Sequence, residues 1–337
     1  MEQSEVQQVF FQHIRNNLPA HLSFVDEIAD LLNISNDSAY RRIRGEKEIS
    51  FDEIRTLCSH FKISLDQLFY LNSESVIFTG RFADHNSFSF EDYLRKNILG
   101  QLEFINSFEK KELLVLNKDI PIFHLFNFHE LAAFKIFFWM KTLLQYPLFS
   151  KSLFVPDELM DSLEKVGKKI VEEYIKLPSQ EIWNVENINS TIHQIEYYKD
   201  TRVFASAQDI VRLYDSLEKT IDHLEKQAEA GYKITMDGKT ANPKAAFKLF
   251  INEFLLGDNT HIALLNEAKV VYINHSVINV IWTKDPAFAE HTYQNFQNII
   301  RKSTLVSDVG EKERSKFFNG MREKIHNRKK AAEHYSS

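Results

Sequence analysis

The chain has 337 residues, enough for two or three domains, and 44% hydrophobic content with 28 Phe supplies material for a large core. A net charge of -6 gives no general basic footprint for nucleic acids or acidic membranes, and a single cysteine, Cys58, excludes an internal disulfide and a cysteine-based metal site. Because Gly and Pro are few, we expect a compact, mainly helical protein.

The chain up to residue 72 has the apolar spacing of short amphipathic helices. The segment FVDEIADLL keeps its apolar side chains on one face, and a polar turn at 33–36 then caps a second helix that stops at Gly45. Ser50, followed three residues later by Glu53, forms a capping box. The five helices expected here cover 6–18, 24–32, 36–44, 51–61 and 65–69.

Four landmarks follow one another along this stretch. They are the pair Ile28-Ala29, the turn at Ile34-Ser35, the stop at Gly45 and the closing run 63–68, ISLDQL. In this order they resemble the lambda-repressor-like (Cro/repressor, XRE-type) helix-turn-helix domains of bacterial and phage transcription regulators. The resemblance covers about fifty residues, which is the usual size of such a domain.

The resemblance implies that the helix 36–44 enters the major groove of double-stranded DNA. Arg41 and Arg44 share a face because they are three residues apart, and arginine can grip guanine with two donors or hold a phosphate. The implied DNA contacts are Asn36, Asp37, Ser38, Tyr40, Arg41, Arg44 and Lys47.

Several points of this helix stay open. Its arginines could form nothing more than a solvated face, and Tyr40 could pack in the core with Ala39 and Ile43 instead of contacting DNA. The family pattern puts an apolar residue at position 42, where this chain has Arg42 followed by Ile43, so the register is open by one residue.

The domain up to residue 72 carries seven Lys or Arg against eleven Asp or Glu. DNA-binding domains are usually basic, so we expect weak non-specific affinity and binding that depends on two copies of the domain. We therefore expect a homodimer on a two-fold operator.

The remaining chain predicts an α+β region that is mostly helical, with a middle part at 73–231 and a C-terminal part at 232–330 that could together form one domain. The helix 128–145 is apolar all round and is expected inside the core. Strand-like runs then predict an antiparallel sheet near 247–282, with hairpin connections at 257–259 and 266–267. The fold class is thus mainly α, a five-helix domain followed by this larger region.

The longest expected helix, 206–231, has apolar residues at alternating four- and three-residue steps, which is a heptad pattern. This seam could join two copies of the chain, or it could pack against its own domain. The seam residues are Ile210, Tyr214, Leu217, Ile221, Leu224 and Ala228.

The common signatures of enzymes and metal sites do not occur in this sequence. We therefore expect no enzyme activity, no cofactor and no metal site, although scattered histidines such as His124, His261, His275 and His291 could serve structurally or as ligands. The aromatic residues Trp183, Trp282 and Tyr272 could line a pocket or fill the core. The sequence also lacks a secretory signal and a membrane-spanning run, so we expect a cytoplasmic protein with no membrane partner.

The hypothesis from the sequence is a sequence-specific DNA-binding transcription regulator, with a C-terminal region that senses an effector, a small molecule or a protein, or that supplies oligomerisation. The alternative is a protein–protein interaction adaptor that uses the helix-turn-helix fold without reading DNA. The acidic balance of the first domain favours the alternative.

Overall fold

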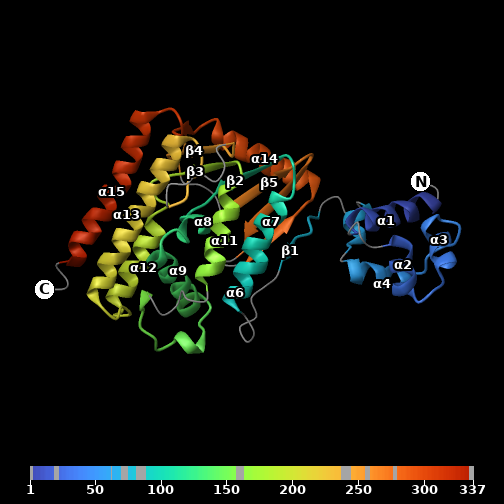
Figure 1. Ribbon diagram of the computed structural model, residues 1–337. Coiled ribbons are helices and arrows are strands. Elements are labelled where there is room, and N and C mark those ends of the chain that lie inside the picture. The colour runs from blue at the N-terminus through green and yellow to red at the C-terminus, as the bar shows by residue number, and fades with distance from the viewer. Residues whose placement is uncertain are drawn as a thin grey trace. The chain divides into compact units, whose positions relative to one another are not determined.

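The computed structural model describes residues 3–18, 23–61, 63–69, 75–80, 89–156, 163–236, 244–254, 259–275 and 279–333. The fold is mixed helix and sheet, and the chain forms two compact units, Met1–Ile77 and Phe78–Ser337 (Figure 1). No helix within the described ranges is both long and apolar enough to cross a membrane.

The smaller unit is helical. Local signals set its boundaries: the Ser35 side chain caps α3, Gly45 follows with a φ of 79°, and Ser50 and Glu53 close a capping box at the start of α4. Its core joins Phe10, Phe11 and Ile14 to buried residues of the next three helices. The helices are α1 (Gln3–Asn17), α2 (Phe24–Leu32), α3 (Asn36–Ile43), α4 (Phe51–Phe61) and α5 (Leu65–Phe69).

The larger unit is built on one eight-stranded sheet in the order β1-β7-β6-β5-β2-β3-β4-β8. Its centre is parallel, β2 beside β3 beside β4, and the strands on both sides are antiparallel. The strands are β1 (Thr79–Gly80), β2 (Lys111–Leu116), β3 (Ser179–Trp183), β4 (Phe247–Ile251), β5 (Thr260–Leu265), β6 (Ala268–Asn274), β7 (Val280–Thr283) and β8 (Thr304–Leu305).

The predicted antiparallel sheet near 247–282 is correct for β5, β6 and β7, which form a meander with a tight connection at Asn266. It is wrong for β4, which does not pair with β5 across the connection 257–259. Instead β4 lies parallel to β3, with Ser179 opposite Phe247, because β2 and β3 lie between β5 and β4 in the sheet. Strands from both sides of residue 232 thus share one sheet.

Helices cover both faces of this sheet (Figure 1). One face packs against α14 through a small cluster that includes Leu114, Val271 and Phe296. The other face carries the main core and the remaining helices. The helices are α6 (Phe90–Tyr93), η1 (Leu94–Leu99), α7 (Gly100–Asn106), α8 (Ile122–Leu125), α9 (His129–Phe138), η2 (Trp139–Leu143), η3 (Pro147–Phe149), α11 (Glu164–Ile175), α12 (Asn189–Asp200), α13 (Ala207–Ala230), α14 (Pro286–Ile300) and α15 (Glu311–Glu333).

The longest helix, α13, begins after its cap Ser206 and ends at Gly231, which has a φ of 73°. All six residues of its heptad seam are at most 3% exposed and belong to the main core. The seam therefore packs against the chain's own helices. The helix predicted at 128–145 is α9, which is buried, followed by the π-helix η2, in which Trp139 is the only buried residue and Leu143 is 41% exposed.

Candidate functional site

The predicted DNA contacts lie together on and just after α3 in the smaller unit. Ser38 is half-buried, and the others are exposed. The Asn36 amide donates to Asp26 Oδ1 at 2.7 Å, which ties the start of α3 to α2. The remaining exposed members are Asp37, Tyr40, Arg41, Arg44 and Lys47.

The register of α3 is set by Arg42, which faces inward with Ala39 and is 6% exposed. Its Nη2 donates to Glu53 Oε1 at 2.7 Å, and its Nη1 donates to the Ser38 carbonyl. Burial alone would raise the pKa of the Glu53 carboxyl, but Arg42 and the Ser50 amide lower it overall. A paired arginine thus takes the inner position, where the family pattern has an apolar residue.

Tyr40 does not pack in the core. Its ring is 44% exposed, and the Arg44 guanidinium lies over it at 4.5 Å. Because the two side chains are four residues apart on one helix, each limits the motion of the other. Tyr40 and Arg44 therefore form one exposed, partly ordered surface.

One residue that positions this surface was missed in the sequence. The Gln7 side chain on α1 donates to the carbonyls of Arg42 and Lys47, at 2.7 and 2.8 Å, and accepts from the Ile49 amide at 3.1 Å. These three bonds hold the loop after α3 against α1. The bonds span 35 to 42 residues, so no local pattern reveals them.

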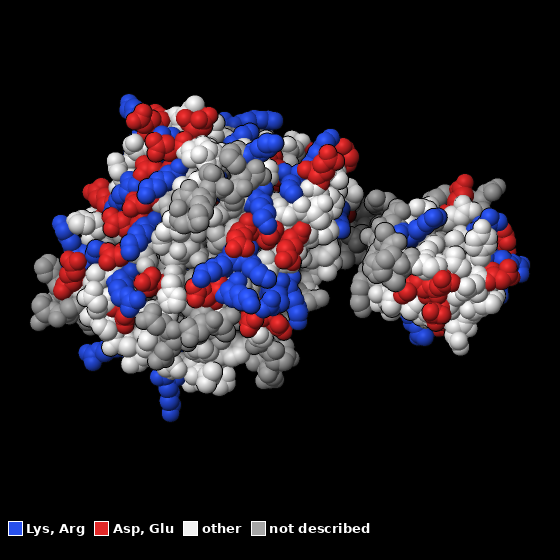
Figure 2. Space-filling model, viewed as in Figure 1, with Lys and Arg blue, Asp and Glu red and all other residues white. Residues whose placement is uncertain are grey.

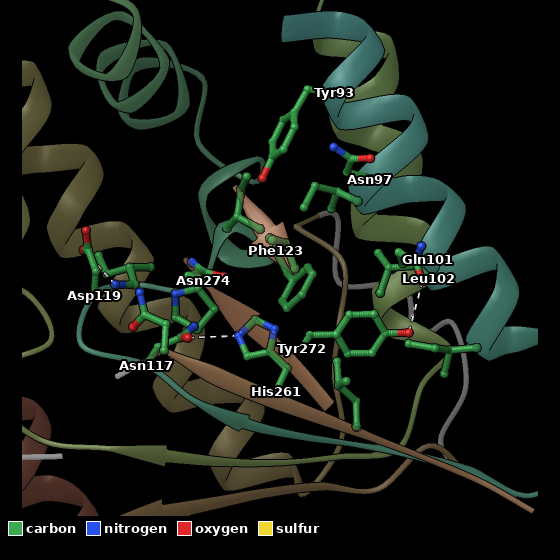
Figure 3. A pocket seen from close by; sticks show the side chains of 18 of the residues that line it. Tyr93, Asn97, Gln101, Leu102, Asn117, Asp119, Phe123, His261, Tyr272 and Asn274 are labelled. Atoms are coloured by element: carbon green, nitrogen blue, oxygen red, sulfur yellow. Dashed lines mark hydrogen bonds between the residues drawn. The ribbon is translucent and has the colours of Figure 1, made fainter. Parts of the chain in front are cut away.

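The larger unit has a cavity of about 120 Å³ between its sheet and the helices η1 and α7 (Figure 3). Apolar and aromatic side chains form most of its wall, among them Phe123, Trp139 and Tyr272. Of the three aromatic residues that the sequence left between a pocket and the core, Tyr272 lines this cavity and also belongs to the main core. Trp183 is buried elsewhere, and Trp282 is half-buried outside the lining.

The polar end of this cavity comes from the ends of neighbouring strands. Leu116 pairs with Thr260, and Thr260 pairs with Ile273, so the next step of the register puts Asn259 between Asn117 and Asn274. All three line the cavity. Asn259 Oδ1 accepts from the Lys118 amide at 2.7 Å. The result is a row of carboxamides across β2, β5 and β6.

His261 comes two residues after Asn259, so its side chain lies on the same face of the sheet as the row. Its Nε2 is 2.9 Å from Asn117 Oδ1, and desolvation in the wall lowers the pKa of the imidazole to about 4. The ring is therefore neutral at pH 7 and donates through Nε2, which leaves Nδ1 as an acceptor.

The sequence does carry a signal for two members of the row, Asn117 and Asn274. The runs that become β2, β3 and β4 are each followed by an asparagine, Asn117, Asn184 and Asn252, and β6 ends on Asn274. These four strands run in the same direction, so the four asparagines lie at the same end of the sheet, where the strands finish. Without the strand order, nothing shows that they meet.

His124 belongs to a buried polar cluster under the same sheet. Its Nε2 is 3.1 Å from both oxygens of Glu181, which also accepts from Tyr174 and from Trp183 Nε1. Burial raises the pKa of Glu181, but His124 and the nearby Lys233 lower it overall. Lys233 donates to Ser179 Oγ at 2.6 Å, and its burial lowers its own pKa to about 7. His124, Glu181 and Lys233 thus each have at least one hydrogen-bond partner.

Within the described ranges, no group of three His, Cys, Asp or Glu side chains could hold a metal ion. His275 and His291 are exposed. Comparison with family models, with curated proteins and with solved structures finds no match.

Proposed function

We propose that the chain is a sequence-specific DNA-binding transcription regulator that acts in the cytoplasm as a homodimer. In this proposal the smaller unit is a lambda-repressor-like helix-turn-helix domain with α3 as its reading helix. The observation that carries it is the exposed set Arg41, Arg44 and Lys47, on and just after a helix whose inner side is fixed by the pair Arg42 and Glu53. The larger unit binds the effector and supplies the contact between copies.

The division of labour within α3 supports base reading. Arg42 is buried and paired with Glu53, so the exposed Arg41 and Arg44 are the arginines that can contact DNA, while the exposed Lys47 is suited to a phosphate. The stacking of Arg44 on Tyr40 reduces the entropy that the arginine loses on binding.

The charges of the smaller unit set the affinity. Acidic side chains gather near the middle of its visible face, and basic ones lie toward the margin (Figure 2). A single copy of such a surface binds DNA weakly, so two copies on one site are needed for specific binding. Small units with few phosphate contacts also have a shallow salt dependence.

A selection of bound sequences from random duplex DNA, made with the full chain, tests this function. Arg41→Ala and Arg44→Ala are each expected to weaken binding by about 1–3 kcal/mol and to relax specificity at one base position. The control is Arg55→Ala, on α4, where the arginine is 78% exposed and paired with Asp52. This variant is expected to bind like the wild type.

If no sequence is enriched and DNA affinity does not depend on salt, the function is wrong. The result would then favour the adaptor alternative, in which the exposed face of α3 binds a protein partner. A loss of binding in Arg55→Ala equal to that in Arg41→Ala would point to general electrostatic attraction instead of base reading.

A further inference from the structure

We infer that the cavity of the larger unit binds a small uncharged molecule, a single flat ring that carries a carboxamide or lactam edge. As the effector site of a regulator this inference rests on the proposed function, whereas the binding itself does not. The carboxamide row and His261 would hold the polar edge, Asn97 on η1 would add one hydrogen bond, and the aromatic wall would hold the ring (Figure 3).

The cavity has polar groups that the fold does not use. Within the described part of the chain, no residue bonds with the side-chain amides of Asn97 and Asn274, and His261 uses only Nε2. Gln101 accepts from Tyr272 at 3.1 Å, which leaves the NH2 group of Gln101. Donors and acceptors therefore both face the cavity, as a carboxamide or lactam requires.

The cavity has no charge to offer. Asp119 is its only charged lining residue among those described. Its carboxylate is already engaged by Lys135 at 2.6 Å, by Ser190 at 3.0 Å and by Thr191 at 3.2 Å. An ionic ligand would lose its hydration without gaining a counter-charge, which disfavours anions and cations alike.

The shape of the wall sets the size of the ligand. Phe123 is stacked on Tyr174 with 4.5 Å between the ring centroids and so presents a fixed ring to the cavity, which Ile98 and Leu102 also line. A cavity of about 150 Å³ in an engineered protein binds benzene. At about 120 Å³ this cavity is somewhat smaller, so it limits the ligand to a single ring and excludes larger ring systems.

Two unusual helical segments contribute to this wall. Asn97 and Ile98 lie on the π-helix η1, and Trp139 begins the π-helix η2. Each wide turn breaks the ordinary helical register and so changes which side chains face the sheet. π-Helical turns cost stability and occur often at functional sites. Their convergence on one cavity supports a binding role over simple filling of the core.

The test compares three probes that share one ring and differ in charge: benzamide, benzoate and benzylamine. Binding to the full chain is measured by calorimetry and ligand-observed NMR at millimolar concentrations, because molecules of this size bind weakly. Benzamide is expected to bind, and the two charged probes are expected to bind at least about fivefold more weakly.

Two variants locate the site. Asn97→Leu and Asn274→Leu are each expected to weaken benzamide binding about fivefold, which corresponds to one lost hydrogen bond. The control is Asn298→Leu, an exposed asparagine on α14 outside the cavity. Unchanged thermal unfolding shows that each variant folds.

Absence of benzamide binding, equal binding of the three probes, or wild-type binding in both cavity variants would overturn the inference. The DNA selection, made on the same preparation without probes, reports separately on the regulator. Ligand binding without DNA selection leaves the site intact and rejects only its regulatory role.

Discussion

The two units differ in whether their functionally informative polar side chains are exposed or buried. In the smaller unit most polar side chains of α3 are exposed. Arg42 is the buried one, and it pairs with Glu53. In the larger unit the informative polar groups lie inside, at strand ends and between sheet and helices. The first arrangement comes from neighbours in sequence, and the second from segments that only the sheet brings together.

The largest effect should come from the interior of the larger unit. Replacement of Glu181 by Gln removes the charge that His124, Trp183 and Lys233 surround, and a broken buried charge cluster typically costs about 3–5 kcal/mol. The free energy of unfolding is measured in denaturant by tryptophan fluorescence. All three tryptophans, Trp139, Trp183 and Trp282, lie in this unit.

The matched control is Glu290→Gln, because Glu290 is half-exposed and pairs with Lys269 on the surface. Its expected cost is much smaller, because an exposed ion pair contributes little to stability. Equal costs for the two replacements would show that the buried cluster adds nothing beyond a surface ion pair.

A smaller effect separates two adjacent arginines. Arg42→Ala leaves the Glu53 carboxylate without its charged partner and should destabilise the smaller unit by about 1–3 kcal/mol. Arg41→Ala should change stability by no more than about 0.5 kcal/mol. Hydrogen exchange of the amides in α3 and α4 of the full chain measures both. If the two variants exchange alike, Arg42 does not fix the helix.

The smallest effect concerns pH in the larger unit. Burial lowers the pKa of His223 and of His261 to about 4, whereas an unfolded histidine titrates near about 6.5. The unfolded chain therefore takes up protons first, and stability falls as the pH drops from about 6.5 toward about 4, by about 1–2 kcal/mol per histidine at pH 5.

Denaturation at pH 7 and pH 5, followed by tryptophan fluorescence, measures this loss. His223→Gln should remove the part of the stability loss that comes from His223. The matched control is His291→Gln, at an exposed position. A pH dependence that is the same in wild type and His223→Gln would show that His223 takes up protons equally when folded and unfolded.

Prediction from the sequence succeeded where the cause is local. The cap within the polar turn 33–36, the capping box at Ser50 and the end of the longest helix at Gly231 each act within a few residues of the helix that they bound. It did not place Arg42 inside, because the compensating carboxylate comes 11 residues later from another helix.

In the larger unit the expected strands exist, but the sequence does not show which strands pair with one another. β4 looked like the neighbour of β5, since the two follow each other in the chain, and its true neighbour β3 comes long before it. The row of Asn117, Asn259 and Asn274 depends on that order and on the register across three strands. The cavity therefore followed only from the structure.

The two outermost strands of the sheet, Thr79–Gly80 and Thr304–Leu305, have two residues each. Edges this short offer another chain almost no free ladder, which is one way in which proteins avoid aggregation through sheet edges. Among the described parts of the larger unit, the proposed homodimer is thus left with the side chains of the helical layers, since the sheet edges are short and the seam of α13 is buried.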